Sequence, residues 1–392
     1  MTVSEEPTPL PGRRAFALGY VQPEHHAAPA GKSFSQRLLL LHIDDDAPLV
    51  VTATGYGLQT AHLLDEVTVT AGGNQLAVEH RFFGTSVAEP PDWSRLDIAE
   101  AAADWHRVIA ALRTVYRGRV LTAGGSKGGV ASLAHRRFFP SDAAGTVAMA
   151  SPISQGAPDG RYPAFVAAIG GTTAAQCRED LRRVQRELLL ARPAMRARMT
   201  ASPLGFTRLG VDKALEDAVL ELPFLFWQFG RISRCVLIPE EGAGDDELFA
   251  FFEDTVILYN FSDEGIGALR GFYVQTANQL GWPAHEEAHL ADLLMFPGGD
   301  RAGAYVPEID TGWDGGAAMS DLVDWMQTEG RQLLLVYGER DPWTAGAPSL
   351  GAAVDSLRLV APGANHNVRI ADLDESGRVA AFNAIRRWAG VD

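Results

Sequence analysis

The stretch that most constrains the fold is a glycine-rich turn, GGSKGG (residues 124–129), placed between two regular segments. It follows the apolar run VLTA and precedes VASLAHRRFF, which is compatible with a helix. A sharp turn from strand to helix holds its central residue in a strained backbone conformation, and small residues two positions to either side let the strand and helix pass closely. We therefore expect Ser126 at the tip of such a turn.

Short apolar runs alternate with helical patterns on both sides of this turn. Before residue 154 we expect strands in FSQRLLLLHI, APLVVTATG, QLAVEHRFF, RVLTAGGS and GTVAMASPI, with a helix over 96–116 between the third and fourth. Near the other end we expect strands over 331–342 and 356–363 and a closing amphipathic helix over 376–390. This order of strands and helices predicts a mostly parallel sheet covered by helices on both faces.

The central stretch has a different character. It is helix-prone and rich in aromatic residues, as in LPFLFWQFG and ELFAFFEDTVILYNF. We therefore expect three parts: the first part of the core over 1–153, an inserted helical lid over 154–328, and the second part of the core over 329–392. A sheet interrupted by a helical insertion predicts the α/β class, as an α/β-hydrolase core with a lid.

A serine hydroxyl is a weak nucleophile and needs a base and an orienting acid to act in catalysis. Asp341 follows the expected strand LLLVYGER, and His366 follows the next apolar run. Both thus belong at the carboxyl ends of parallel strands, where Ser126 also emerges, and the chain order serine, acid, histidine is that of α/β-hydrolases. We predict Ser126 as nucleophile, His366 as base and Asp341 as its partner.

Hydrolysis by a serine also requires donors for the developing oxyanion. The backbone N–H of Lys127 follows the nucleophile directly, and the helix N-terminus adds partial positive charge there. A second donor is expected from the loop at Gly55 and Tyr56, by analogy with the fold. The alternative for that loop is a plain turn.

A possible metal-binding motif lies in the central stretch. His285 and His289 match the zinc-protease pattern H-E-x-x-H, and Glu308 follows downstream. We expect a helix that starts at Trp282-Pro283 within the lid, and we favour an acidic, solvated face of that helix over a metal site. No metal and no cofactor are expected.

Charge, hydropathy and cysteine content bear on the partners and location of the protein. The net charge of −15 and the lack of clustered Lys and Arg argue against a nucleic-acid partner. No apolar run approaches the roughly 20 residues that span a bilayer, and no basic region followed by an apolar stretch opens the sequence, so we expect no membrane contact and a cytoplasmic location. Cys177 and Cys235 allow one disulfide, but we favour two buried small side chains.

Four longer stretches resemble the bacterial prolyl tripeptidyl aminopeptidases. These are EHRFFGTSVAEPPDWSRLDIAEAAADWHRVI, GGSKGGVASLAHRRFFPSDAAGTVAMASPIS, YGERDPWTAGA and PGANHNVRIADL. A weaker likeness extends to RGFYVQTANQLGWP in the lid. More distantly, the EHR strand, the GGS-x-GG turn and the D-P-W acid loop resemble the prolylcarboxypeptidase and dipeptidyl peptidase II group.

The resemblance implies a serine peptidase that removes short fragments, expected to be tripeptides, from a free peptide N-terminus by cleaving after proline. It assigns the triad to Ser126, Asp341 and His366. An esterase or acyltransferase that uses the same triad on a small or biosynthetic peptide is the alternative.

The substrate-binding residues follow less directly. A proline ring could be bound by Trp343, which lies beside Asp341 in the sequence, and by the lid aromatics Phe226 and Trp227, with Phe224 and Phe229. For the lid residues the alternative is an ordinary role in the core of the lid. Glu240, Glu241 and Glu253 are candidate partners for the substrate amine.

Overall fold

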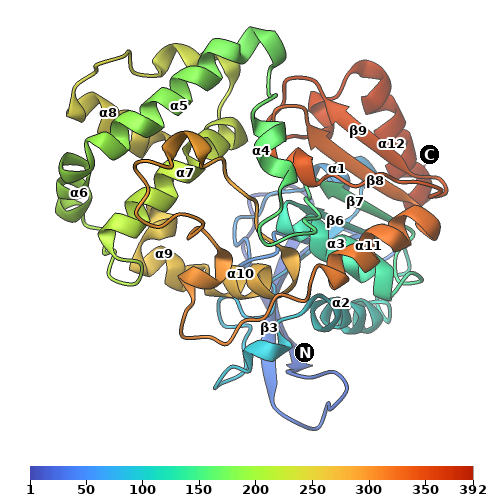
Figure 1. Ribbon diagram of the computed structural model, residues 1–392. Coiled ribbons are helices and arrows are strands. Elements are labelled where there is room, and N and C mark those ends of the chain that lie inside the picture. Colours follow the sequence, from blue (N-terminus) through green and yellow to red (C-terminus); the bar gives the residue numbers. More distant parts are fainter. Residues whose placement is uncertain (392) are drawn as a thin grey trace.

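The computed structural model, which describes residues 1–391, places all strands in one sheet (Figure 1). The sheet has nine strands in the order β1-β2-β3-β5-β4-β6-β7-β8-β9. Five neighbouring pairs, from β5-β4 to β8-β9, are parallel, and the three pairs from β1 to β5 are antiparallel. The strands are β1 (Thr2–Glu6), β2 (Arg14–Pro23), β3 (Ser33–His42), β4 (Leu49–Ala53), β5 (Asn74–Val78), β6 (Val120–Gly125), β7 (Gly145–Met149), β8 (Leu333–Gly338) and β9 (Leu357–Ala361).

The predicted α/β-hydrolase fold with its mostly parallel sheet is confirmed, and each strand expected from the sequence forms. The first two strands were not expected. All five residues of β1 are exposed, and its sequence TVSEE offers no apolar alternation. An edge strand of this kind is held by main-chain hydrogen bonds, which do not require particular residue types and so give no sequence pattern.

Helices cover both faces of the sheet, as alternate burial along the strands requires. In β4, Val50 packs in one apolar cluster with α1 and α12, whereas Leu49 and Val51 pack in another with α2. On that second side, α3 and α11 pack with β8 through a further cluster. These helices are α1 (Glu66–Ala71), α2 (Ile98–Leu112), α3 (Lys127–Phe138), α11 (Ala317–Thr328) and α12 (Glu375–Ala389).

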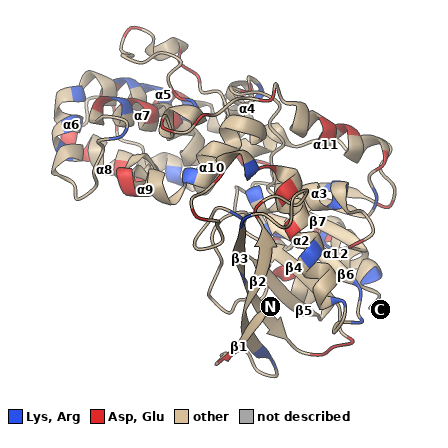
Figure 2. Ribbon diagram, turned by 90° about the horizontal axis from the view of Figure 1, so that it is seen from below, with Lys and Arg blue, Asp and Glu red and all other residues tan. Residues whose placement is uncertain are grey.

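A layer of helices lies beside the sheet and has its own core. Figures 1 and 2 show α5 to α9 gathered to one side, away from α12 and the carboxyl end of the chain. This core is lined by residues such as Phe226, Trp227 and Phe252. The members are α4 (Arg161–Val166), α5 (Ala175–Leu190), α6 (Arg192–Ala201), α7 (Val211–Phe229), α8 (Asp245–Thr255), α9 (Asp263–Ala268) and α10 (Arg270–Gln275).

Helix α7 connects this helical layer to the sheet. It has 19 residues, and its carboxyl end meets the loop after β9. The His366 N–H donates to the carbonyl oxygen of Gln228 (3.0 Å), and Asn365 Nδ2 donates to the carbonyl oxygen of Phe229 (2.9 Å). Of the helices in residues 1–391, none is both long and apolar enough to cross a membrane.

The expectation of two unpaired cysteines is wrong. Cys177 of α5 and Cys235, in the turn after α7, form a disulfide across a sequence separation of 58 residues. Their Cα atoms lie 5.4 Å apart because α5 packs beside α7, a tertiary contact that the spacing of two cysteines does not reveal. Disulfides persist mainly in oxidising compartments, so the bond counts against the cytoplasmic expectation.

The disulfide should stabilise the helical layer measurably. Closing a loop of this length removes chain entropy from the unfolded state equivalent to about 4 kcal/mol. We expect reductant to lower the denaturant midpoint of the wild-type protein and to leave unchanged that of a Cys177→Ser, Cys235→Ser variant, measured by circular dichroism. Equal midpoints for the wild-type protein with and without reductant would contradict the assignment.

Candidate functional site

The turn at Ser126 has the geometry that its glycines predict. Ser126 lies between β6 and α3 with φ of 52° and ψ of −129°, a region that side-chain-bearing residues rarely adopt. A Cβ atom on Gly128 would overlap the Ala53 carbonyl, and one on Gly124 would overlap the backbone of Gly128. The close passage of strand and helix therefore depends on these glycines and leaves the serine at the tip of a strained turn.

Asp341 and His366 meet after the neighbouring strands β8 and β9. The carboxylate of Asp341 is fully buried, and its Oδ2 lies 2.8 Å from His366 Nδ1. Its Oδ1 accepts a hydrogen bond from the Trp343 N–H (3.0 Å), which fixes the orientation of the carboxylate. A histidine that donates from Nδ1 to a buried carboxylate presents its Nε2 as a base.

Ser126 and His366 line the same cavity, of about 380 Å³, where the sheet edge meets the helical layer. The structure thus brings together the three residues predicted as a triad, with Asp341 behind His366. Trp343 also lines this cavity, as predicted, and its ring packs edge-on against Phe224 of α7 at 5.0 Å between centroids. Further apolar walls are Leu225, Phe229, Phe261, Leu269, Phe272 and Trp282.

The expected oxyanion donors are partly supported by the hydrogen bonding. Within residues 1–391, the N–H groups of Lys127 and Gly55 take part in no hydrogen bond. The Tyr56 N–H instead donates to Thr54 Oγ1 (3.1 Å), so in this structure it is not free to bind an oxyanion. Gly55 has φ of 83°, and a Cβ atom there would lie 2.7 Å from the Gly128 nitrogen, so only glycine fits beside the start of α3.

The side chain of Lys127 has a role that sequence analysis missed. Its Nζ donates to the carbonyl oxygen of Gly55 (2.5 Å) and lies 5.3 Å from the ring centroid of Tyr56 and 5.1 Å from that of Phe83. Burial lowers the pKa of this ammonium well below its usual value. Because the side chain joins α3 to the loop at 54–57, it holds the Gly55 backbone beside Ser126.

Two predicted substrate-binding residues lie elsewhere. Phe226 and Trp227 are fully buried in the core of the helical layer, and neither lines the cavity of Ser126. Their neighbours Phe224 and Phe229 line it instead. The aromatic run spans more than one full turn of helix, so only some of its members can face the sheet edge, and sequence alone did not give the rotation of α7.

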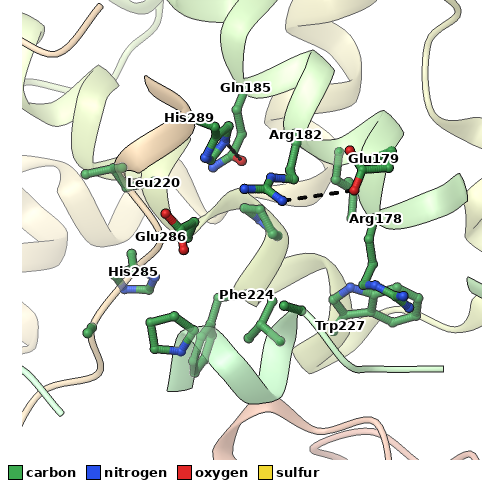
Figure 3. Close-up of a pocket in the computed structure, with 16 residues that line it drawn as sticks. Arg178, Glu179, Arg182, Gln185, Leu220, Phe224, Trp227, His285, Glu286 and His289 are labelled. Atoms are coloured by element: carbon green, nitrogen blue, oxygen red, sulfur yellow. Dashed lines mark hydrogen bonds and ion pairs between the residues drawn. The ribbon is translucent and has the colours of Figure 1, made fainter. Parts of the chain in front are cut away.

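The predicted helix over the H-E-x-x-H motif is absent from this segment, and its two histidines have separate surroundings. Figure 3 shows His289 beside Gln185, with His285 well apart and close to Phe224. His289 Nε2 lies 2.9 Å from Gln185 Oε1, whereas His285 Nε2 lies 3.2 Å from Asp300 Oδ2. Glu308 pairs with Arg208 and Arg270 instead. Pro283 itself forms an isolated parallel β-bridge with Asp159 and starts no helix.

The carboxylates suggested for a substrate amine are also elsewhere. Glu240, Glu241 and Glu253 are exposed and do not line the cavity. The carboxylate that lines this cavity belongs to Glu221 of α7, which sequence analysis missed. The available signal was an acidic residue within the apolar run LELPFLFW, on the same helix face as Phe224, Leu225 and Gln228.

Comparison with known proteins gives a close match over the whole chain. A family model described as PS-10 peptidase S37 matches residues 1–392. The prolyl tri/tetrapeptidyl aminopeptidase of Streptomyces mobaraensis is 38% identical over 396 residues, covering 98% of this chain and 82% of that protein.

Two solved structures match most of this chain at low sequence identity. The proline iminopeptidase of Mycobacterium smegmatis is 15% identical with a TM-score of 0.44, covering 95% of this chain and 99% of that one. Acetyl xylan esterase 1 from Thermoanaerobacterium sp. JW/SL YS485 is 12% identical with a TM-score of 0.42, covering 99% and 87%.

A fluorophosphonate probe should label this chain at Ser126. We expect Asp341→Asn to slow labelling by about 10³- to 10⁴-fold because the imidazole loses the partner that fixes its tautomer. Asp245→Asn, which makes the same change at an exposed position of α8, serves as control. The measurement is the labelling rate by mass spectrometry of the intact protein and its peptides. A label on another residue, or equal rates for both variants, would count against the triad.

Removing the Lys127 amine should impair turnover through the Gly55 loop. We expect Lys127→Met, which keeps much of the side-chain volume, to lower kcat for p-nitrophenyl acetate by roughly 10- to 100-fold. This effect is no larger than the effect of removing a whole oxyanion donor. Steady-state kinetics on a variant with the wild-type circular dichroism spectrum give the measurement. An unchanged kcat would show that the loop holds its position without this contact.

Proposed function

The chain belongs to the PS-10 peptidase S37 family and is a serine peptidase, and we propose that it releases short fragments, chiefly tripeptides, from free peptide N-termini by cutting after proline. The observation that supports this most is the cavity shared by Ser126 and His366, which is enclosed by aromatic side chains of the helical layer. The 38% identical relative named for prolyl tri- and tetrapeptidyl aminopeptidase activity supports the same proposal.

The proposed first step forms an acyl-enzyme. Ser126 Oγ attacks the carbonyl carbon of the scissile bond while its proton passes to His366 Nε2. Asp341, hydrogen-bonded at Nδ1, holds the imidazole in the required tautomer and stabilises the imidazolium that forms. The same proton then passes to the nitrogen of the departing peptide, and the bond to that nitrogen breaks.

The oxyanion of each tetrahedral intermediate would be bound by the N–H groups of Lys127 and Gly55. Both are free of other hydrogen bonds in the described part of the chain; Lys127 follows Ser126 directly, and Gly55 lies against the backbone of Lys127 and Gly128. Water, deprotonated by His366, then attacks the ester carbonyl and releases the fragment, and the proton returns to Ser126 Oγ.

The walls of the cavity account for a preference for proline. Trp343 and Phe224 pack edge to face and, with Phe229 and Phe272, offer apolar surface to a compact, non-donating ring. Because the helical layer covers Ser126 on the side opposite the sheet, we propose that it admits a chain end more readily than an internal segment.

The proposal is tested with peptide anilides that differ in one feature at a time. We expect cleavage of Ala-Ala-Pro-p-nitroanilide, and a value of kcat/KM lower by about 10- to 150-fold when its amine is acetylated, the range that corresponds to one lost hydrogen bond to a charged group. Ala-Ala-Ala-p-nitroanilide measures the contribution of proline, and Ser126→Ala is the control for background hydrolysis.

Two outcomes would contradict the proposed aminopeptidase activity. Equal hydrolysis of the free and acetylated substrates would indicate an endopeptidase. Hydrolysis of simple esters without cleavage of any anilide would favour the esterase or acyltransferase alternative.

A further inference from the structure

The cavity of Ser126 has a charged end. Glu221 lines it, two helical turns before the carboxyl end of α7. Phe224, Leu225 and Gln228 line the cavity from the same helix, at spacings of three, four and seven residues from Glu221. These spacings place all four residues on one helix face. The face that contributes apolar walls beside the nucleophile therefore also presents a carboxylate.

Glu221 has polar neighbours that are themselves incompletely bonded. Acceptor atoms of Glu221, His285 and Asp300 all lie within 4.8 Å of one another. The side chains of His285 and Asp300 are 6% and 3% exposed, and His285 Nε2 lies 3.2 Å from Asp300 Oδ2 without the geometry of a hydrogen bond. Neither atom has a hydrogen-bond partner elsewhere within residues 1–391, and buried polar atoms of this kind are rare in folded proteins.

No Lys or Arg side chain of residues 1–391 forms an ion pair with Glu221 or Asp300. The nearby Lys213 ammonium is bound to Asp217, at 2.7 and 2.9 Å, and to the carbonyl oxygen of Gly299. Its charge acts on Asp300 only through space. Burial and repulsion by the neighbouring carboxylates raise the pKa of Glu221 well above its usual value, and burial raises that of Asp300 to about 7. A cation placed among these groups would stabilise their ionised forms.

We propose that Glu221, together with Asp300 and His285, binds the α-ammonium group of the substrate and so sets the number of residues removed. This inference rests on the proposed peptidase function and assigns the residues that recognise the substrate's free end.

The donors and acceptors match in number. A primary ammonium has three N–H donors. Glu221 and Asp300 Oδ2 each offer a carboxylate oxygen, and burial lowers the pKa of His285 to about 4, so its ring is neutral at pH 7 and Nε2 can accept when Nδ1 holds the proton. Trp282 and Tyr273 also line the cavity, and Trp282 Nε1 donates to Asp300 Oδ1 (3.2 Å), which leaves Oδ2 to accept from the ammonium.

The distance along α7 fits a fragment of three residues. Seven residues separate Glu221 from Gln228, which corresponds to about 10.5 Å of helix. The Gln228 carbonyl oxygen accepts from the N–H of His366, so this end of α7 lies at the catalytic histidine. Three extended residues span about 10 Å. A chain whose amine is held at Glu221 would thus present its third carbonyl to Ser126.

A divalent metal ion is the other cation that a glutamate, a histidine and an aspartate could bind. The ammonium is favoured because the cluster opens into the cavity of the nucleophile and is flanked by apolar rings. Phe224 and His285 line this cavity and also a smaller one, of about 100 Å³, whose lining residues are drawn in Figure 3.

The test compares Ala-Ala-Pro-p-nitroanilide with its acetylated form in the wild-type enzyme, Glu221→Gln and Asp300→Asn. Glu253→Gln removes the same charge at an exposed site on α8 and is the matched control. We expect both cluster variants to lower the ratio of kcat/KM for the free over the acetylated peptide by about 10- to 100-fold, the effect of a lost charged hydrogen bond, and the control to keep that ratio. Fluorophosphonate labelling at Ser126 identifies folded protein.

A ratio that is unchanged in Glu221→Gln, while the wild-type enzyme discriminates between the peptides, would overturn this inference and leave the peptidase function standing. A wild-type enzyme that cleaves neither peptide would overturn both. Isothermal titration with Zn²⁺ and Mn²⁺ forms the second arm: micromolar binding that is lost in Glu221→Gln, together with cleavage that a chelator abolishes, would assign the cluster to a metal instead.

Discussion

The site depends on one constraint, namely that the parallel strands β6, β8 and β9 end at the same edge of the sheet. Ser126 follows β6 in a backbone conformation that Gly124 and Gly128 make possible, and Asp341 and His366 follow β8 and β9. Since the sheet is rigid and buried, the hydrogen bond between Asp341 and His366 forms across two short loops with little freedom to lose. The catalytic geometry thus follows from the fold.

The helical layer completes what the sheet edge begins. Helix α7 is bonded through Gln228 and Phe229 to the loop that contains His366, and its apolar face forms one wall of the cavity. One helix thereby places the base, encloses the nucleophile and presents Glu221 at the far end. A shift of α7 along its axis would change all three relationships together. Large buried side chains such as Phe226 and Trp227 pack the opposite face of α7 in the core of the helical layer and oppose such a shift.

The sequence indicated those features that depend on local pattern. The turn at Ser126, the strands around it and the chain order of the three catalytic candidates each follow from signals within a few residues. Such local signals could not predict how α7 is rotated about its axis or whether the two cysteines pair. Phe226 and Trp227 face the core where Phe224 faces the cavity, His285 and His289 belong to no common helix, and Cys177 meets Cys235 only because α5 packs beside α7. Glu221 was missed for the same reason.

A crystal structure of the enzyme inactivated by an Ala-Ala-Pro diphenyl phosphonate would test the central claim most directly. We expect phosphorus bonded to Ser126 Oγ, a phosphonyl oxygen within hydrogen-bond distance of the N–H groups of Lys127 and Gly55, and His366 still bonded to Asp341. Phosphorus on another residue, or His366 turned away from both Ser126 and Asp341, would contradict the account.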